Sequence, residues 1–267
     1  MRILLLSLLL TACTAITPIT IPTLTPERPN VQPIVDDALA FLEAQYNPRY
    51  HLLQESPDIG QHRYYITNDN LLAEHIFALY GIDKPLDLRG YTGNGFIEIA
   101  FGYNVRWPPY HHIDVVVEQH GEDQVLYESH DGPGYFSDWS GFSNLACMTI
   151  VNEYNAGNRE VAERLYEMQM ESFDGHGWPD LAYQRRDGVY ETLGLAWCLY
   201  AGALLEHPDQ RVMMQLSAQQ ADNGGFHTHY TADESRLADP NIETTSVAIL
   251  ALYTVQHGPP KQLGVPN

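Results

Sequence analysis

Four acidic residues each stand just before an apolar, helix-forming segment of the chain. They are Asp69, Asp138, Glu191 and Glu243, at intervals of 69, 53 and 52 residues. If the following helices run parallel, as in a stacked repeat, their amino-terminal ends meet at one rim. Crowded carboxyl groups raise one another's pKa, and paired carboxyl groups supply the acid and base of glycoside hydrolysis. The alternative interpretation is structural, because an acid in the first turn of a helix stabilises that helix.

Three loops that contain glycine, acidic or aromatic residues are expected to reach the same rim. They hold Glu55, the segment FDGHGWPD at 173–180 and the segment ADNGGFHTHY at 221–230. Aromatic faces combined with a few polar groups are typical of small-ligand sites. The alternative is that these aromatic side chains only fill the end of the helical core. The predicted substrate-binding residues are Glu55, Asp138, Asp180, Trp178, His227 and Tyr230.

The residues predicted to act as acid or base, or to contact substrate, are Glu243, Glu191 and Asp69. A glycoside hydrolase would use two such carboxyl groups, whereas a polysaccharide lyase would use a His or Tyr base beside a neutralised uronate. We therefore expect a carbohydrate-active protein of one of these kinds. A non-catalytic module that binds a glycan or a protein through the same rim is the alternative, and the sequence leaves open whether the protein is an enzyme.

Metal and cofactor chemistry has little support in the sequence, and we predict no cofactor. His227 and His229 would place two imidazoles on one side of an extended segment, and Asp180, Asp222 or Glu191 could be a third zinc ligand. Calcium held by carboxylates is a further alternative. The chain contains no GxSxG, P-loop or HExxH motif.

The segments that must position these residues alternate between two kinds of helix. Residues 193–205 and 247–253 contain no charged side chain, and residues 71–80 and 142–151 are similar. Helices that are apolar on every face belong inside a core. Other segments carry apolar residues on one side only, as with Val35, Leu39 and Leu42, and should cover the inner helices. About seven long helices are expected.

An insertion at about residues 85–130 separates the first acid from the second. Its runs at 95–105, 112–119 and 124–128 are alternating or β-branched and are divided by Gly, Asn and Pro. This pattern predicts a small β-meander laid on the helical domain.

The string QQADNGGFHTHY followed by NIETTSVAILALY resembles the repeat of α/α-toroid proteins, which include terpenoid cyclases, prenyltransferases and six-hairpin glycosidases. The longer pattern over about residues 34–256, with YYITNDNLLA and GVYETLGLAWCLY, is similar to a group of uncharacterised prokaryotic proteins. The resemblance is specific for fold more than for activity. Its implied fold is mainly α, a partial α/α toroid of about seven helices with a small inserted β-meander, closed by that insertion or by another chain.

Two departures argue against isoprenoid chemistry. The zinc-binding cysteine of the prenyltransferases has no counterpart in a comparable loop, and the DxDD and DDxxD strings of terpene cyclases are absent.

The amino terminus reads as an export signal. Residues 3–10 are apolar apart from Ser7 and lead into LTAC, which resembles the lipobox of bacterial lipoproteins. The resemblance implies cleavage before Cys13 and acylation of its thiol, and an ordinary secretory signal is the alternative. The predicted organisation is a signal peptide at 1–12, a lipid-anchored Thr/Pro-rich tether at 13–33, the domain at 34–258 and a tail at 259–267. The protein would be exported and anchored to the cell membrane, or otherwise secreted.

The chain carries 34 Asp and Glu against 14 Lys and Arg, a formal charge of −20. This excess argues against nucleic acid and against membrane contact other than the lipid anchor, and it favours a polar small molecule or glycan as partner. The oligomeric state is left open. Cys147 and Cys198 lie in apolar segments, where buried free thiols and a disulfide are both possible readings.

Overall fold

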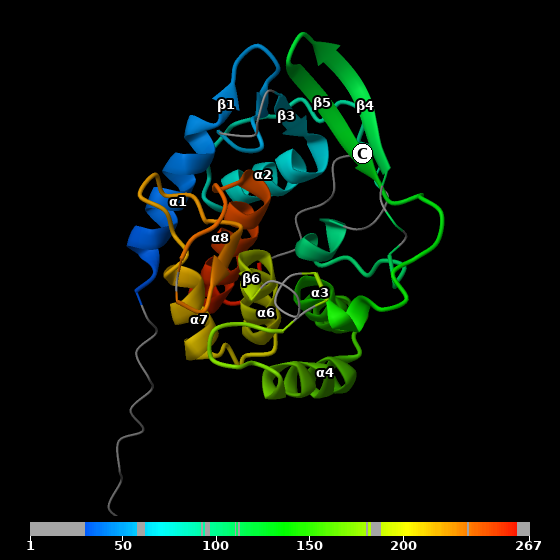
Figure 1. Cartoon of the computed structure of the whole chain (residues 1–267), viewed down its shortest axis with the longest axis vertical. Helices are drawn as coiled ribbons and strands as arrows, with labels where there is room; N and C mark the ends of the chain where they lie inside the picture. The colour runs from blue at the N-terminus through cyan, green and yellow to red at the C-terminus, as the bar shows by residue number, and fades with distance from the viewer. Residues whose placement is uncertain are drawn as a thin grey trace, which may run out of the picture.

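The computed structural model describes residues 30–57, 62–91, 93, 97–109, 111, 113–179, 181–182, 188–233 and 235–260. The signal peptide, Cys13, nearly all of the tether and most of the tail therefore lie outside the described residues. Within them the chain forms seven α-helices and is mainly α, as predicted (Figure 1). The helices are α1 (Gln32–Ala44), α2 (Thr67–Leu79), α3 (Ser143–Asn155), α4 (Arg159–Glu171), α6 (Thr192–Leu204), α7 (Gln210–Ser217) and α8 (Ile242–His257).

Four helices form the inner layer and pack side by side in the order α2, α8, α6, α3. These are the helices whose sequences are apolar almost all round, and every residue of α6 is buried. The last helix, α8, returns between α2 and α6, so neighbours in space are not neighbours in sequence. The apolar side chains on all sides of these four helices form the main part of the hydrophobic core.

Three amphipathic helices cover this layer, with α1 against α8, α4 against α3 and α7 against α6. Helix α4 buries only Ala162 and Tyr166, and its charged residues face outward. On α1, Val35 and Leu42 are buried and Leu39 is partly buried against the core, as the apolar stripe predicts. No helix among the described residues has the length and apolar character needed to cross a membrane.

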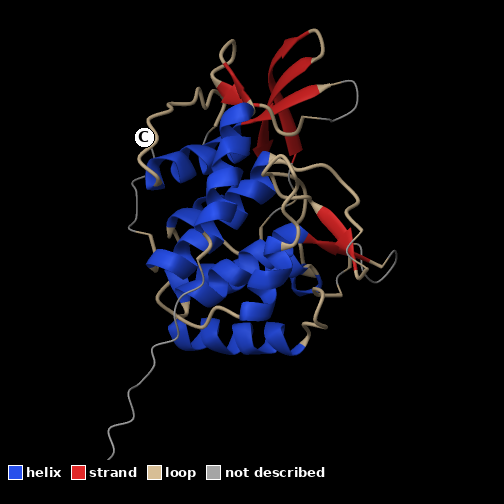
Figure 2. Cartoon of the chain, turned by 90° about the vertical axis from the view of Figure 1, so that its left-hand side faces the viewer, coloured by secondary structure: helices blue, strands red, loops and turns tan. Residues whose placement is uncertain are grey.

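A three-stranded sheet lies at one end of the helical part, opposite α4 (Figures 1 and 2). Its strands are β3 (Arg63–Ile66), β4 (Ile113–His120) and β5 (Asp123–Ser129). The order is β3-β5-β4, with β3 parallel to β5 and β4 antiparallel to it. Two-stranded pairs are formed by β1 (Tyr46–Asn47) with β2 (Leu52–Leu53), and by β6 (Val189–Glu191) with β7 (His229–Thr231).

The predicted β-meander is therefore wrong in one of its three strands. The hairpin of β4 and β5 matches two predicted runs, but residues Ile97–Phe101 form a 3-10 helix whose five residues are all buried. This 3-10 helix packs against α2 and α3, and the side chains on all of its sides are buried. The third strand, β3, comes instead from before α2 and is outside the proposed insertion.

Asparagine side chains attach strands and a loop to the inner helices. The Asn70 amide donates to Leu53 O at 3.1 Å, and Leu53 N donates to Asn70 Oδ1 at 2.6 Å. Asn68 makes the same pair of bonds with the backbone of Glu128, and Asn152 with that of Val105. Each amide thus replaces the backbone partner that a strand neighbour would provide.

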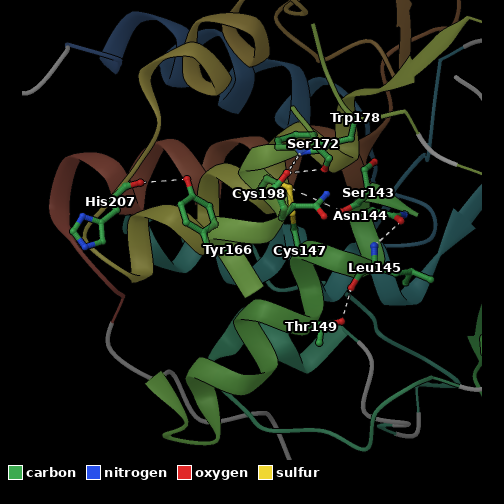
Figure 3. Close-up of a disulfide and its surroundings, with 11 residues drawn as sticks. Ser143, Asn144, Leu145, Cys147, Thr149, Tyr166, Ser172, Trp178, Cys198 and His207 are labelled. Carbon is green, nitrogen blue, oxygen red and sulfur yellow. Dashed lines mark hydrogen bonds between the residues drawn. A yellow bond between two sulfur atoms is a disulfide. The ribbon is translucent and has the colours of Figure 1, made fainter. Parts of the chain in front are cut away.

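A disulfide between Cys147 of α3 and Cys198 of α6 settles the open question about these cysteines. Their Cα atoms are 4.9 Å apart, and both residues are fully buried between the two inner helices. Figure 3 shows the bridge beside the first turn of α3, where Ser143 O lies 4.0 Å from Cys198 Sγ.

We predict that replacing both cysteines, Cys147→Ala with Cys198→Ala, lowers the free energy of unfolding by about 4 kcal/mol, because the bridge spans 51 residues and restricts the unfolded chain. Urea unfolding followed by circular dichroism measures the change. The parent protein kept reduced in the same urea series is the control and should behave like the double variant. An unchanged unfolding midpoint would contradict the prediction.

Candidate functional site

A cavity of about 420 Å³ lies where the four inner helices begin, since residues at the starts of α2, α3, α6 and α8 line it. Its lining includes Asp69 from the first turn of α2, Glu191 at the start of α6 and Glu243 from the first turn of α8. The structure thus brings together the three residues predicted as acid, base or substrate contact, although they are far apart in sequence. Their chemical roles stay a prediction.

Sequence reasoning missed several residues of the same cavity. Glu128 at the end of β5 and His130 just after it add a fourth carboxyl group and an imidazole. Phe136 and Phe142 provide aromatic surface, and Asn144 provides an amide. Nothing local in the sequence marks Glu128, because the parallel pairing of β5 with β3 and the bonds to Asn68 place it here.

The local structure explains why these acids converge. Glu191 pairs with His229 between β6 and β7, and Thr192 N donates to Thr228 O at 2.9 Å as α6 begins. Asn241 caps α8, since its side-chain oxygen accepts from Thr244 N at 2.9 Å. The carboxyl groups therefore extend from anchored helix starts.

Glu55 is not among the described residues that line the cavity. Ile242 N donates to Glu55 O at 2.9 Å, which ties this residue to the start of α8. Its carboxyl group is buried and hydrogen-bonded to the carboxyl group of Asp69. The nearness of these two carboxyl groups disfavours a negative charge on both at once.

The pKa values follow from burial and from the nearness of like charges. Burial raises the pKa of Glu55 to about 7, and repulsion from Glu128 adds to the effect against the hydrogen bonds that lower it. Burial, with repulsion from Glu55 and Glu243, raises the pKa of Asp69 well above its ordinary value. Glu243 is raised well above its ordinary value in the same way, by burial and by repulsion from Glu128. No Lys or Arg is among the described residues that line the cavity. Burial and like-charge repulsion thus both favour the protonated forms of these carboxyl groups.

Two predicted substrate-binding aromatic residues lie in the packing instead. Trp178 is buried, and its ring nitrogen donates to Gln169 O at 2.7 Å. Tyr230 is fully buried, stacks on Tyr190 and donates to His176 O at 2.6 Å. Their polar groups are used within the protein, which matches the alternative interpretation that these rings fill the end of the core.

Two further predicted site residues, Asp138 and His227, are not among the described residues that line the cavity. Asp138 is exposed and precedes the short 3-10 helix Trp139–Gly141 rather than an inner helix. His227 is half-buried, with Nδ1 hydrogen-bonded to Ala238 O at 2.7 Å. Asp180 is outside the described residues.

The structure does not support the zinc site considered from the sequence. His229 Nδ1 is hydrogen-bonded to Thr228 Oγ1 at 2.8 Å, and His227 Nδ1 is hydrogen-bonded to a backbone carbonyl. In the described part of the chain no three His, Cys, Asp or Glu residues are arranged to hold a metal ion.

Comparison with known proteins adds nothing to this geometry, since no protein-family model, curated protein or solved structure matches the chain.

We predict that Glu55→Gln becomes more stable relative to the parent as the pH rises from about 4.5 to 7. In the parent, the pKa of Glu55 is higher in the folded state than in the unfolded state. Ionisation of Glu55 over this range therefore destabilises the folded state by up to roughly 3 kcal/mol. Burial lowers the pKa of His75 to about 4, which acts in the opposite direction in both proteins and cancels in the difference.

Urea unfolding of both proteins at pH 5, 6, 7 and 8 measures this difference. Glu171→Gln, at an exposed position near the end of α4, is the matched control and should give no pH-dependent difference. A stability difference between Glu55→Gln and the parent that stays constant with pH would show that Glu55 ionises normally.

Proposed function

We propose that this chain is a carbohydrate-active protein that works at the acid-lined cavity. The observation that carries the proposal is the convergence of Asp69, Glu191 and Glu243, from three separate helix starts, on one cavity that also has two phenylalanine rings. Its volume is within the usual range for small-ligand sites. Aromatic rings can stack on the apolar face of a sugar while carboxyl and amide groups bind its hydroxyls.

The proposed architecture is a partial α/α toroid. Four inner helices packed against one another and three outer helices laid on them are the arrangement expected of such a fold. The β-sheet beside the cavity would then cover the incomplete side of the ring, since Glu128 of β5 is part of the lining.

Hydrolysis is favoured over elimination as the chemistry. A lyase must bind and neutralise a uronate, and the described lining provides four acids and no Lys or Arg for that purpose. Glycoside hydrolysis requires a protonated carboxyl group beside an ionised one. Asp69 or Glu243, whose pKa values are raised, would donate the proton to the leaving group, and Glu191 would act as base or nucleophile.

We predict that Glu191→Gln and Glu243→Gln lower turnover of a susceptible oligosaccharide by about 10²-fold or more, because each removes a group that transfers a proton or attacks. Release of reducing ends from a panel of neutral and amino-sugar oligosaccharides measures turnover. Glu171→Gln is the control with unchanged turnover. Full activity in both cavity variants would refute the assignment, and binding without turnover in every form would favour the non-catalytic module.

We further propose that the protein is exported and anchored through Cys13. The buried disulfide supports an oxidising compartment, where such bonds form and persist. Because the net charge is strongly negative, the protein surface itself would not bind an anionic membrane, and the lipid chain would provide the attachment.

Expression of the full chain in a bacterium with labelled fatty acid tests the anchor. We expect the parent and Thr17→Ala to carry the label in the membrane fraction and Cys13→Ala to lose it, because acylation requires the thiol. Label retained in Cys13→Ala, or absent from the parent, would favour the secreted alternative.

A further inference from the structure

Strand β4 is at an edge of the three-stranded sheet. The strand order is β3-β5-β4, so β4 has β5 on one side and no strand of the described residues on the other (Figure 1). Its residues Ile113, Val115, Val116 and Val117 are 46%, 41%, 52% and 37% exposed. An exposed apolar edge attracts another strand, because that strand can bind the outward N–H and C=O groups and cover the side chains.

The exposed side chains of β4 lie on both faces of the sheet. Val115 is opposite Tyr127 of β5 and Val116 is opposite Leu126, so these two neighbouring residues point to opposite faces. A molecule bound on one face would cover only one of the two sets. A strand added in the plane of the sheet contacts both sets, which makes an extended peptide segment the partner that fits this edge.

Strand β4 has few of the features that keep strand edges from pairing. It contains neither Lys nor Pro. A bulge shifts the register with β5 between Val116 and Glu118, and it leaves residues 113–116 regular. Three of the four exposed apolar residues are in this regular part, so the edge that is open to pairing is also the apolar one.

The tether before the domain has a sequence suited to this edge, although it lies outside the described residues. Pro18, Pro22 and Pro26 follow one another at intervals of four. In an extended strand, alternate residues direct their N–H groups to opposite sides, so the three prolines share one side. The odd-numbered residues from Thr17 to Thr25 keep an N–H group at every position on the other side. Such a segment can pair along one side only, which is the setting in which strands tolerate proline.

The composition and charge of the tether also fit β4. Residues 14–26 contain only Thr, Ile, Pro, Leu and Ala, and most of them are β-branched. Because no charged side chain occurs there, the segment meets no repulsion from a chain whose net charge is −20. A second copy of β4 would instead bring its own Asp114 and Glu118 to the same edge.

The tether cannot pair along this length with the edge of its own domain. Residues 27–31 connect Pro26 to the start of α1, and they extend over at most about 18 Å. Helix α1 itself, with 13 residues, is about 20 Å long. Figure 1 shows the start of α1 and β4 on opposite sides of the molecule, farther apart than the two ends of α1. The tether that pairs with β4 must therefore come from another molecule.

We propose that the tether of one copy of this chain adds to the free edge of β4 in a second copy. The odd-numbered residues of 17–25 face β4, and the prolines face outward. The sheet then has four strands, and the prolines on its new edge stop further strands from adding. This inference does not depend on the proposed carbohydrate activity.

Co-purification of two differently tagged copies of the full chain tests the proposal. Both copies are expressed together in a bacterium, extracted in a mild detergent and captured through one tag, and the second copy is measured by immunoblot. We expect Ile21→Pro in both copies to reduce the captured second copy at least about tenfold, because each contact loses an N–H group that faces β4. The matched control Thr20→Pro introduces the same residue on the outward side and should leave capture unchanged.

Mixed pairs identify the two partners of the contact. Val115→Lys combined with Val116→Lys places charge on both faces of the edge, and it should abolish capture when both copies carry it. One copy with these edge substitutions and one with Ile21→Pro should still associate, since the intact tether of the first pairs with the intact edge of the second. Circular dichroism verifies that the edge variant folds.

A synthetic peptide of residues 14–27 gives a measurement that needs no edge variant. It should compete with capture of the parent copies, and so should the peptide N-methylated at Thr20, whereas N-methylation at Ile21 should prevent competition. Parent copies that do not co-purify overturn the proposal, and so does equal behaviour of the substitutions or peptides altered at positions 20 and 21. If Ile21→Pro copies associate and edge variants do not, β4 pairs with another β4 and the tether is not its partner.

Discussion

Electrostatic repulsion among buried carboxyl groups acts directly at the starts of the inner helices. Glu55, Asp69 and Glu243 would move apart or into solvent if the elements that carry them were free to do so. They are not free, because Asn70 fixes the strand before Glu55 and the Ile242 amide binds the Glu55 carbonyl. The hydrogen bonds of the Asn70 side chain and of the Ile242 amide thus hold the carboxyl groups in positions that their mutual repulsion opposes.

The stability needed to maintain this arrangement comes from elsewhere in the molecule. The inner helices bury apolar residues on all sides, with α6 buried throughout, and the outer helices add one apolar face each. The disulfide joins α3 to α6. This separation is expected of a preorganised site. The packed helices keep the carboxyl groups close together although they repel one another, and a bound ligand would reduce that repulsion.

Sequence periodicity was enough to predict the inner and outer helices, because an uninterrupted apolar run such as 193–205 has no other stable position than a core. The position of Asp69, Glu191 and Glu243 just before or within such helices also predicted that they would meet. The wrong or missing predictions have one cause, which is that a local sequence pattern does not show which distant segments pack around it. Alternation in residues 97–101 did not distinguish a buried 3-10 turn from a strand, and Trp178 and Tyr230 were predicted to bind substrate although both are packed in the core. Glu128 could not be found, since a parallel strand pairing and an asparagine 60 residues away bring it to the cavity.

The bridge between Cys147 and Cys198 has a consequence for what happens to the chain when a protease cuts it. Helix α4 and the segment leading to β6 lie between the two cysteines, so a single peptide bond cut there leaves both products covalently joined. The inner helices would keep their neighbours, and the cavity its helix starts. This stretch can therefore be nicked, or can accept insertions over generations, without releasing half of the molecule.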